Sequence, residues 1–298
     1  MKSLVVLSGK GGTGKTTVVA ALAHLAGGAG EPAVVLVDAD PDAANLALLL
    51  DAREQDAHDF EGGAVAVIDP AACRDCGACW KQCRFDAVTR VGRTFRVDPL
   101  ACEGCGACTH VCPDGAIHME PRVTGRWYRS RTPYGTLVHA ELFPAGENSG
   151  KLVSRVRAEA EAVARAESAR LLLVDGPPGI GCPAIAAAAR ADRVLIVTEP
   201  TRAGLHDLER AVAMTRHFGV PAAVCLNRAD LHEAGARAVE HWCAVNGVEL
   251  AGIVPYDDAV SGALARGVPV DRAAPEGPAA AALRRLWDRL CADLQDET

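Results

Sequence analysis

Residues 8–17 read SGKGGTGKTT and lie between the apolar run Leu4–Leu7 and a helical pattern that extends to Leu25. A Gly-x4-Gly-Lys-Thr spacing between a strand and a helix start predicts a phosphate-binding loop. Glycines allow backbone N–H groups to turn inward around anionic oxygens, and the helix N-terminus adds partial positive charge. We therefore expect a nucleotide to contact Gly9, Lys10, Gly11, Gly12, Thr13, Gly14, Lys15, Thr16 and Thr17.

Two side chains of the loop have the expected chemistry for phosphoryl transfer. Lys15 would reach the β- and γ-phosphates as a catalytic residue, and Thr16 would offer its hydroxyl to Mg²⁺. A glycine-rich strand-to-helix turn without a ligand is the alternative. The match of both motif and context favours the phosphate site.

Lys10 adds a second lysine to the loop, which in this respect resembles the deviant Walker A loop of the MinD, ParA, Mrp and nitrogenase iron protein group. The resemblance implies a homodimer that sandwiches the nucleotides. In such a dimer Lys10 would be catalytic, touching the phosphates bound by the partner subunit much as an arginine finger does. The alternative is a solvated loop lysine.

Composition limits the classes of protein to be considered. The 298 residues are 49% hydrophobic, carry a net charge of −7 and include twelve cysteines. No apolar run approaches the length of a membrane span, and the N-terminus runs into the phosphate loop instead of forming a signal peptide. No basic block indicates nucleic-acid binding. Twelve cysteines without an export signal indicate metal ligation in a reducing cytoplasm.

Short apolar runs alternate with helical patterns along most of the chain. This alternation predicts a doubly wound α/β fold with a mainly parallel sheet, of the P-loop NTPase type. Strands are expected at Leu4–Leu7, Ala33–Val37, Leu137–Leu142, Leu171–Val174, Val194–Thr198, Ala222–Leu226 and Leu250–Val254. Helices are expected at Lys15–Leu25, Asp42–Leu50, Gly150–Ala166, Ala184–Ala189, Gly204–His217, Leu231–Val245 and Ala279–Leu294.

Residues 62–125 break this alternation and contain an internal repeat. CRDCGACWKQCRFDAV at 73–88 is followed by CEGCGACTHVCPDGAI at 102–117, and all four cysteines recur. Because the β–α alternation resumes afterwards, we predict a small α+β bacterial ferredoxin-like domain at 62–125. It would be inserted into a P-loop ATPase domain formed by residues 1–61 and 126–298.

Each repeat has the Cys-x2-Cys-x2-Cys-x3-Cys spacing of bacterial ferredoxins with [4Fe–4S] clusters, where the fourth cysteine of each run ligates the other cluster. One cluster would take Cys73, Cys76, Cys79 and Cys112, and the other would take Cys102, Cys105, Cys108 and Cys83. Pro113 follows Cys112 as in ferredoxins, whereas Arg84 follows Cys83. Two Cys₄ zinc sites are the alternative, although such sites usually combine two Cys-x2-Cys pairs.

Two strand ends are expected to supply carboxylates to the nucleotide site. Asp38 and Asp40 resemble the first switch of the family, which implies that Asp38 holds the Mg²⁺ water shell and that catalytic Asp40 orients the attacking water. The alternative is helix capping, and Asp42 is expected to cap the next helix. The run Leu171–Asp175 has the Walker B form, so Asp175 should hold Mg²⁺ through water.

Asn227 and Arg228 resemble the adenine-reading strand end of the family, although they also fit ordinary turn chemistry. Pro255 and Tyr256 resemble the loop that closes over the base, with the same alternative. Cys182 has the spacing of a cluster ligand in the nitrogenase iron protein, but residues 144–151 lack the second cysteine. Two roles for Cys182 stay open, a structural cysteine and a transient ligand or redox thiol.

The leucine stripe of the terminal helix 279–294 favours core packing over membrane attachment. Taken together, the chain resembles MinD-superfamily P-loop ATPases with an inserted ferredoxin domain. The resemblance implies ATP, Mg²⁺ and two [4Fe–4S] clusters as cofactors. It leaves three functions open: an ATP-driven electron carrier with redox protein donor and acceptor, an iron–sulfur carrier for an apo-protein client, and a MinD- or ParA-like switch with structural or sensing clusters.

Overall fold

The computed structural model describes residues 1–27, 34–144, 146 and 149–296, and the side chains of 293–296 are not part of that description. The chain divides into two compact units. The first comprises Met1–His58, Trp127–Glu141 and Ser149–Thr298, and the second comprises Asp59–Arg126 and Leu142–Asn148. Strands β3 and β6 contribute residues to both units.

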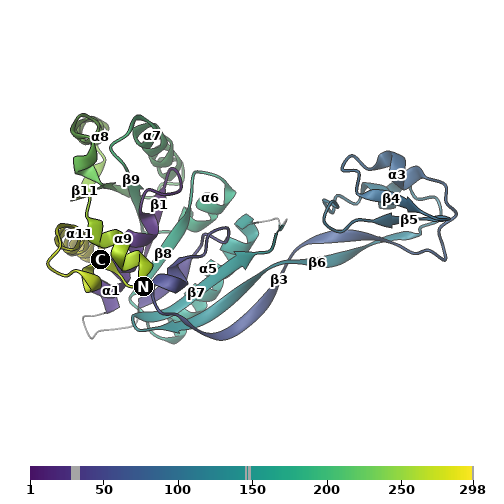
Figure 1. Ribbon diagram of the computed structural model, residues 1–298, viewed down its shortest axis with the longest axis horizontal. Coiled ribbons are helices and arrows are strands. Elements are labelled where there is room, and N and C mark those ends of the chain that lie inside the picture. The colour runs from purple at the N-terminus through teal and green to yellow at the C-terminus, as the bar shows by residue number, and fades with distance from the viewer. Residues whose placement is uncertain (28–33, 145, 147–148, 297–298) are drawn as a thin grey trace. The chain divides into compact units, whose positions relative to one another are not determined.

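A nine-stranded sheet in the order β11-β10-β9-β1-β8-β2-β7-β6-β3 is the framework of the first unit (Figure 1). Every pairing from β11 to β7 is parallel, which confirms the mainly parallel α/β fold. The strands are β1 Lys2–Ser8, β2 Val34–Asp38, β3 Arg53–Ile68, β6 Ile117–Thr132, β7 Gly135–Leu142, β8 Leu171–Pro178, β9 Arg193–Thr198, β10 Ala222–Asn227 and β11 Glu249–Val254.

The helices of the first unit follow the strands along the chain. They are α1 Lys15–Gly27, α2 Leu46–Leu49, α5 Ser149–Ala166, α6 Cys182–Ala188, α7 Arg202–His217, α8 Glu233–Asn246, α9 Asp258–Ala265, α10 Val270–Ala273 and α11 Pro278–Asp296, with a 3-10 turn η1 at Ala229–Leu231. In the part of the chain that is described, no helix is long and apolar enough to cross a membrane.

Helices cover both faces of the sheet because its central strands are apolar on both sides. Leu4 and Val6 of β1 join one core cluster with residues of α1, α10 and α11. Val5 and Leu7 point the other way and are equally buried. On that second face Arg157 of α5 donates from Nη2 to the Ser3 hydroxyl at 3.1 Å. The alternation of side chains along β1 therefore places α1 and α5 on opposite faces.

The second unit is small and has its own core. It contains α3 Ala78–Gln82, the antiparallel hairpin of β4 Val88–Val91 and β5 Thr94–Val97, and α4 Ala107–Val111. Ile68, Phe95 and Ile117 form the centre of this core, and cysteines of both repeats pack against it. The hairpin and short helices therefore bring the two repeats together within this unit.

The structure differs from the sequence expectations in several places, among them the unexpected helices α9 and α10. The strands β3 and β6, sixteen residues each, were not expected. The helix expected at 42–50 is only α2, because Asp38 Oδ2 accepts the N–H of Leu46 at 3.0 Å and residues 41–45 remain in turns. The capping role assigned to Asp42 is thus wrong, and Asp38 takes it. Ala33, the expected start of the second strand, lies outside the described residues.

Candidate nucleotide site and cysteine site

The phosphate loop follows β1 directly, and its shape depends on two glycines with positive φ. Gly12 has φ +82° and Gly14 has φ +91°, in the left-handed region that favours glycine. A Cβ on Gly14 would lie 2.3 Å from Asn227 Nδ2, so Gly14 also allows a close approach. Asn227 Nδ2 donates to the Thr13 carbonyl oxygen at 2.7 Å. The end of β10 therefore braces the loop from outside.

Thr13 provides an observation that fits an oxygen-rich ligand. The residue is 2% exposed, and its hydroxyl has no hydrogen-bond partner among the described residues. A buried hydroxyl without a partner is unfavourable unless a ligand or water satisfies it. Gly9 packs closely against Asp207 of α7, and Gly11 is exposed. Thr16 and Thr17 form the first turn of α1 and are half-buried.

Lys15 lies at the centre of a buried group of charges. Its Nζ atom is 2.5 Å from Asp175 Oδ1, and the two side chains are 7% and 1% exposed. Burial alone would lower the pKa of Lys15, but the charges of Asp175, Asp38 and Asp40 outweigh it and raise that pKa. Lys15 is therefore held as a cation facing the strand ends.

The register of the sheet brings two of the acidic residues side by side. Asp38 of β2 is directly opposite Asp175 of the parallel strand β8. Burial raises the pKa of Asp38 well above its usual range, and the nearby charge of Asp175 raises it further. Burial also raises the pKa of Asp40, against the opposing effect of Lys15. Carboxylate oxygens are the ligands that Mg²⁺ prefers, and a bound cation would relieve this repulsion.

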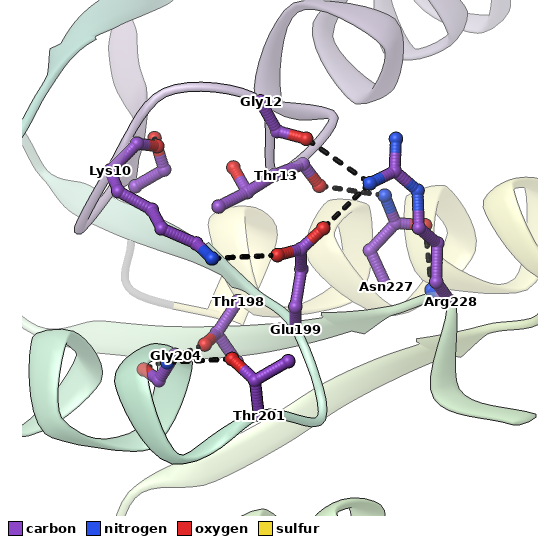
Figure 2. Close-up of polar contacts among 10 residues, drawn as sticks. Lys10, Gly12, Thr13, Thr198, Glu199, Thr201, Gly204, Asn227 and Arg228 are labelled. Atoms are coloured by element: carbon purple, nitrogen blue, oxygen red, sulfur yellow. Dashed lines mark hydrogen bonds and ion pairs between the residues drawn. The ribbon is translucent and has the colours of Figure 1, made fainter. Parts of the chain in front are cut away.

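Glu199 is a member of the site that the sequence expectations missed. Its Oε2 atom is 3.1 Å from Lys10 Nζ, and its Oε1 atom accepts from Arg228 Nη1 at 2.6 Å (Figure 2). The same Arg228 nitrogen reaches the Gly12 carbonyl oxygen at 3.2 Å. The sequence could have indicated Glu199, because it directly follows the predicted parallel strand Val194–Thr198 and ligand sites of α/β sheets lie at such strand ends.

The residues expected around the base line one pocket. Asn227, Arg228, Pro255 and Tyr256 share it with Gly14 and Thr17. The rest of its wall is mostly apolar and includes Val260 and Leu264 of α9, Leu283 of α11, Val18 of α1 and Val254 of β11. Tyr256 is 44% exposed, and its backbone N–H donates to Asp230 Oδ1 at 2.6 Å. A mainly apolar pocket with a few polar groups suits a flat heterocycle.

In the second unit, cysteines from both repeats line another pocket. Cys73, Cys76 and Cys79 of the first repeat meet Cys112 of the second there, beside Phe95 and Ile117. The cysteines expected for the other cluster also lie near one another. Burial raises the pKa of Cys108, and the nearby charges of Cys102, Cys105 and Cys83 raise it further. The described residues contain no group of three or more His, Cys, Asp or Glu set close enough to hold a single metal ion.

The four remaining cysteines occupy two kinds of environment. Cys225 and Cys243 are buried and Cys291 is half-buried, and burial raises their pKa values to about 12, 11 and 11. Such thiols are poor nucleophiles and metal ligands. Cys182, in contrast, is exposed at the first residue of α6, next to Gly150. Of the stretch 144–151, which lacks a second cysteine, Ala145, Glu147 and Asn148 lie outside the described residues.

Comparisons with known proteins agree with this geometry. The family model for the CobQ/CobB/MinD/ParA nucleotide binding domain matches residues 4–270, and the chain belongs to this family. A curated relative is the uncharacterized protein MJ0578 of Methanocaldococcus jannaschii, 31% identical over 229 residues, which cover 77% of this chain and 79% of that protein. The uncharacterized ATP-binding protein MJ0547 of the same organism is 27% identical over 293 residues, with 97% and 87% covered.

Solved structures show the same fold at low sequence identity. The septum site-determining protein MinD complexed with Mg-ADP from Pyrococcus horikoshii is 20% identical with a TM-score of 0.63, over 97% of this chain and 95% of that one. The cell division ATPase MinD of Pyrococcus furiosus is 21% identical with a TM-score of 0.59, over 97% and 98%. At this level of identity the likeness establishes the fold alone.

Proposed function

We propose that this protein is a dimerising, ATP-binding and ATP-hydrolysing iron–sulfur protein in which the nucleotide state controls electron transfer through two [4Fe–4S] clusters. Residues 62–125 would be the ferredoxin-like domain and the rest of the chain the P-loop ATPase. The observation that carries the proposal is the meeting of Cys73, Cys76, Cys79 and Cys112 at one pocket, in a chain that also has the Lys15 site.

In the nucleotide site each residue has a distinct task. The glycine-rich backbone and Lys15 would bind the phosphates, and Thr16, Asp38 and Asp175 would hold Mg²⁺, which neutralises charge on the phosphates. Asp40 would orient the attacking water and accept its hydrogen bond, for which its carboxylate must be ionised. Lys10 would reach the phosphates of the partner subunit's nucleotide. The pocket at Asn227 and Tyr256 would bind adenine.

In the second unit the donor set fits clusters better than zinc. Four thiolates on one zinc ion lie about 2.3 Å from it, so all four must converge on one point. Structural zinc sites usually combine two Cys-x2-Cys pairs, whereas Cys73, Cys76, Cys79 and Cys112 are three cysteines of one repeat and one of the other, all lining one pocket. Each thiolate of a [4Fe–4S] cluster binds a different iron, which requires a wider arrangement. Bound clusters would supply one-electron chemistry at potentials that the surrounding protein sets.

The chain offers a direct connection between the two chemistries. Asp38 accepts the N–H of Leu46 at the start of α2, and β3 begins four residues after α2 ends and passes into the second unit. A change at Asp38 on binding or losing the γ-phosphate would therefore act on the segment that leads to the cysteines. Ordering of switch loops by that contact is the general basis of nucleotide switches.

Redox titration of anaerobically reconstituted protein, monitored by electron paramagnetic resonance, tests the proposal. We expect two cluster signals, and a change of at least one reduction potential when a non-hydrolysable ATP analogue is added. Electron delivery from a ferredoxin or flavoprotein to candidate acceptors should depend on the nucleotide in the same way. Protein that remains colourless after reconstitution, or whose potentials and electron delivery ignore the nucleotide, would refute the proposal.

The exposure of Cys182 favours a second candidate function, that of an ATP-dependent iron–sulfur carrier for an apo-protein client. An exposed thiol can act as a transient ligand, whereas the buried cysteines of the first unit cannot. Transfer of labelled iron to an apo-protein would support this function if Cys182→Ala abolishes transfer. A MinD- or ParA-like switch with structural or sensing clusters is the third candidate. Unchanged localisation after cluster loss would indicate structural clusters, and changed localisation would indicate sensing ones.

A further inference from the structure

Glu199 lies at the mouth of the phosphate loop for reasons of sheet register. In the parallel pairing of β1 with β9, Ser8 is opposite Val197, so the chain leaves the sheet at Glu199 where the loop begins. The side chain of Glu199 is 13% exposed, which removes most of its contact with water. A carboxylate with so little hydration needs cationic or donor partners close by.

The turn that carries Glu199 is fixed by contacts with α7. The Thr198 hydroxyl donates to the Gly204 carbonyl oxygen at 3.0 Å, and Gly204 N–H donates to Thr201 Oγ1 at 2.9 Å (Figure 2). A Cβ on Gly204 would lie 2.4 Å from the Glu199 carbonyl oxygen, so the helix start packs directly against this backbone. The turn therefore leaves Glu199 little freedom to point elsewhere.

The two oxygens of Glu199 contact different cations of the site. Lys10 comes from the phosphate loop and Arg228 from the end of β10. Their side chains are 40% and 38% exposed. Arg228 has a left-handed backbone at φ +53° and also reaches the Gly12 carbonyl oxygen. One carboxylate thus links the loop that receives phosphate to the strand end that lines the base pocket.

We propose that Glu199 is a positioning residue, which restrains Lys10 and Arg228 within one chain through a shared carboxylate. The proposal rests on the proposed function, in which Lys10 contacts the phosphates of a partner subunit's nucleotide and Arg228 lies beside the adenine pocket. Lys10 has to give up Glu199 to reach phosphates bound by a partner subunit, so Glu199 opposes ATP-dependent self-association. It also holds Arg228 at the loop and the base pocket, so it favours nucleotide binding by the single chain.

The variant Glu199→Gln keeps the size of the side chain and removes its charge. We expect its Mg-ADP dissociation constant, measured by calorimetry, to rise about two- to tenfold, as for loss of a partly buried ion pair. The protein concentration for half-maximal self-association with Mg-ATP, measured by sedimentation, should fall by a similar factor. Glu209→Gln, which removes an exposed charge on the helix α7 that follows this turn, should change neither quantity.

Two further measurements separate positioning from a general structural effect. In an Arg228→Gln background, Glu199→Gln should no longer weaken Mg-ADP binding, because the cation through which it acts is gone. Competitive acetylation read by mass spectrometry should show faster modification of Lys10 in Glu199→Gln, by about two- to tenfold relative to exposed Lys151 in the same sample. Unchanged thermal midpoints would show that the variants are folded.

The outcomes distinguish this inference from the proposed function. Wild-type protein that binds Mg-ADP but does not self-associate with Mg-ATP contradicts the dimer, while the ADP and acetylation measurements still decide the role of Glu199. If Glu199→Gln matches Glu209→Gln in those measurements, or acts equally with and without Arg228, the positioning role is wrong. Wild-type protein that binds no nucleotide refutes both.

Discussion

Replacing Lys15 by methionine removes the cation that holds the acidic strand ends together. Its pair with Asp175 is almost fully buried, with side chains 7% and 1% exposed. Removing one partner of such a pair costs roughly 3–5 kcal/mol, because the other charge stays buried. In a unit of roughly 150–250 residues, 1 kcal/mol corresponds to about 2–4 °C, so the unfolding midpoint should fall by about 6–20 °C.

Lys10→Met is the matched control, since it makes the same chemical change in the same loop. Lys10 is 40% exposed and its partner Glu199 is 13% exposed. Exposed pairs contribute about 0–1 kcal/mol, so the midpoint should fall by no more than about 4 °C. Thermal unfolding followed by circular dichroism at pH 8, without added nucleotide, compares the two variants directly.

The stability that Lys15→Met loses relative to wild type should depend on pH, because the carboxylates around Lys15 remain. Burial and the charge of Asp175 already raise the pKa of Asp38, and loss of Lys15 raises it further. The folded variant then binds more protons than its unfolded chain, so its stability relative to wild type increases as the pH falls. The reasoning would be refuted if the stability loss of Lys15→Met grew as the pH was lowered from 8 to 5.5. It would also be refuted if Lys15→Met and Lys10→Met lowered the unfolding midpoint equally.

Three further predictions follow from single residues. Burial lowers the pKa of His139 to about 4. The His139 contribution to the free energy of unfolding should therefore fall by about 3 kcal/mol as the pH is lowered from 6.5 to 4. His139→Gln should lose this contribution when unfolding is followed by urea titration at each pH. Gly14→Ala, which would place a Cβ 2.3 Å from Asn227 Nδ2 at positive φ, should weaken Mg-ADP binding at least about tenfold by calorimetry. Cys112→Ala should lower the bound iron of reconstituted protein by about half, whereas Cys182→Ser should not.

Much of the first unit could be predicted because its signals are local. Leu4–Leu7 is a continuous apolar run, and the glycines and lysines after it specify a loop and a helix start within a few residues. The carboxylate of β8 was equally clear, since the apolar run Leu171–Val174 leads directly to Asp175. In such segments the local propensity, the hydrophobic pattern and the final fold all favour the same structure, so the sequence alone locates them.

The features that were missed depend on contacts between distant parts of the chain. β3 carries charges at Arg53, Glu54 and Asp56, and β6 contains Pro121, so neither reads as a strand. Their neighbours in the sheet decide their conformation. Glu199 likewise became visible only when the fold placed it between cations from two other segments.

The charged start of β3 has a consequence for how copies of this protein can meet. β3 is the last strand of the sheet, and at its beginning Arg53 and Glu54 are exposed and Asp56 is half-buried. Charged side chains on an outermost strand discourage backbone pairing with a second chain. An assembly of this molecule therefore has to use surfaces other than that rim.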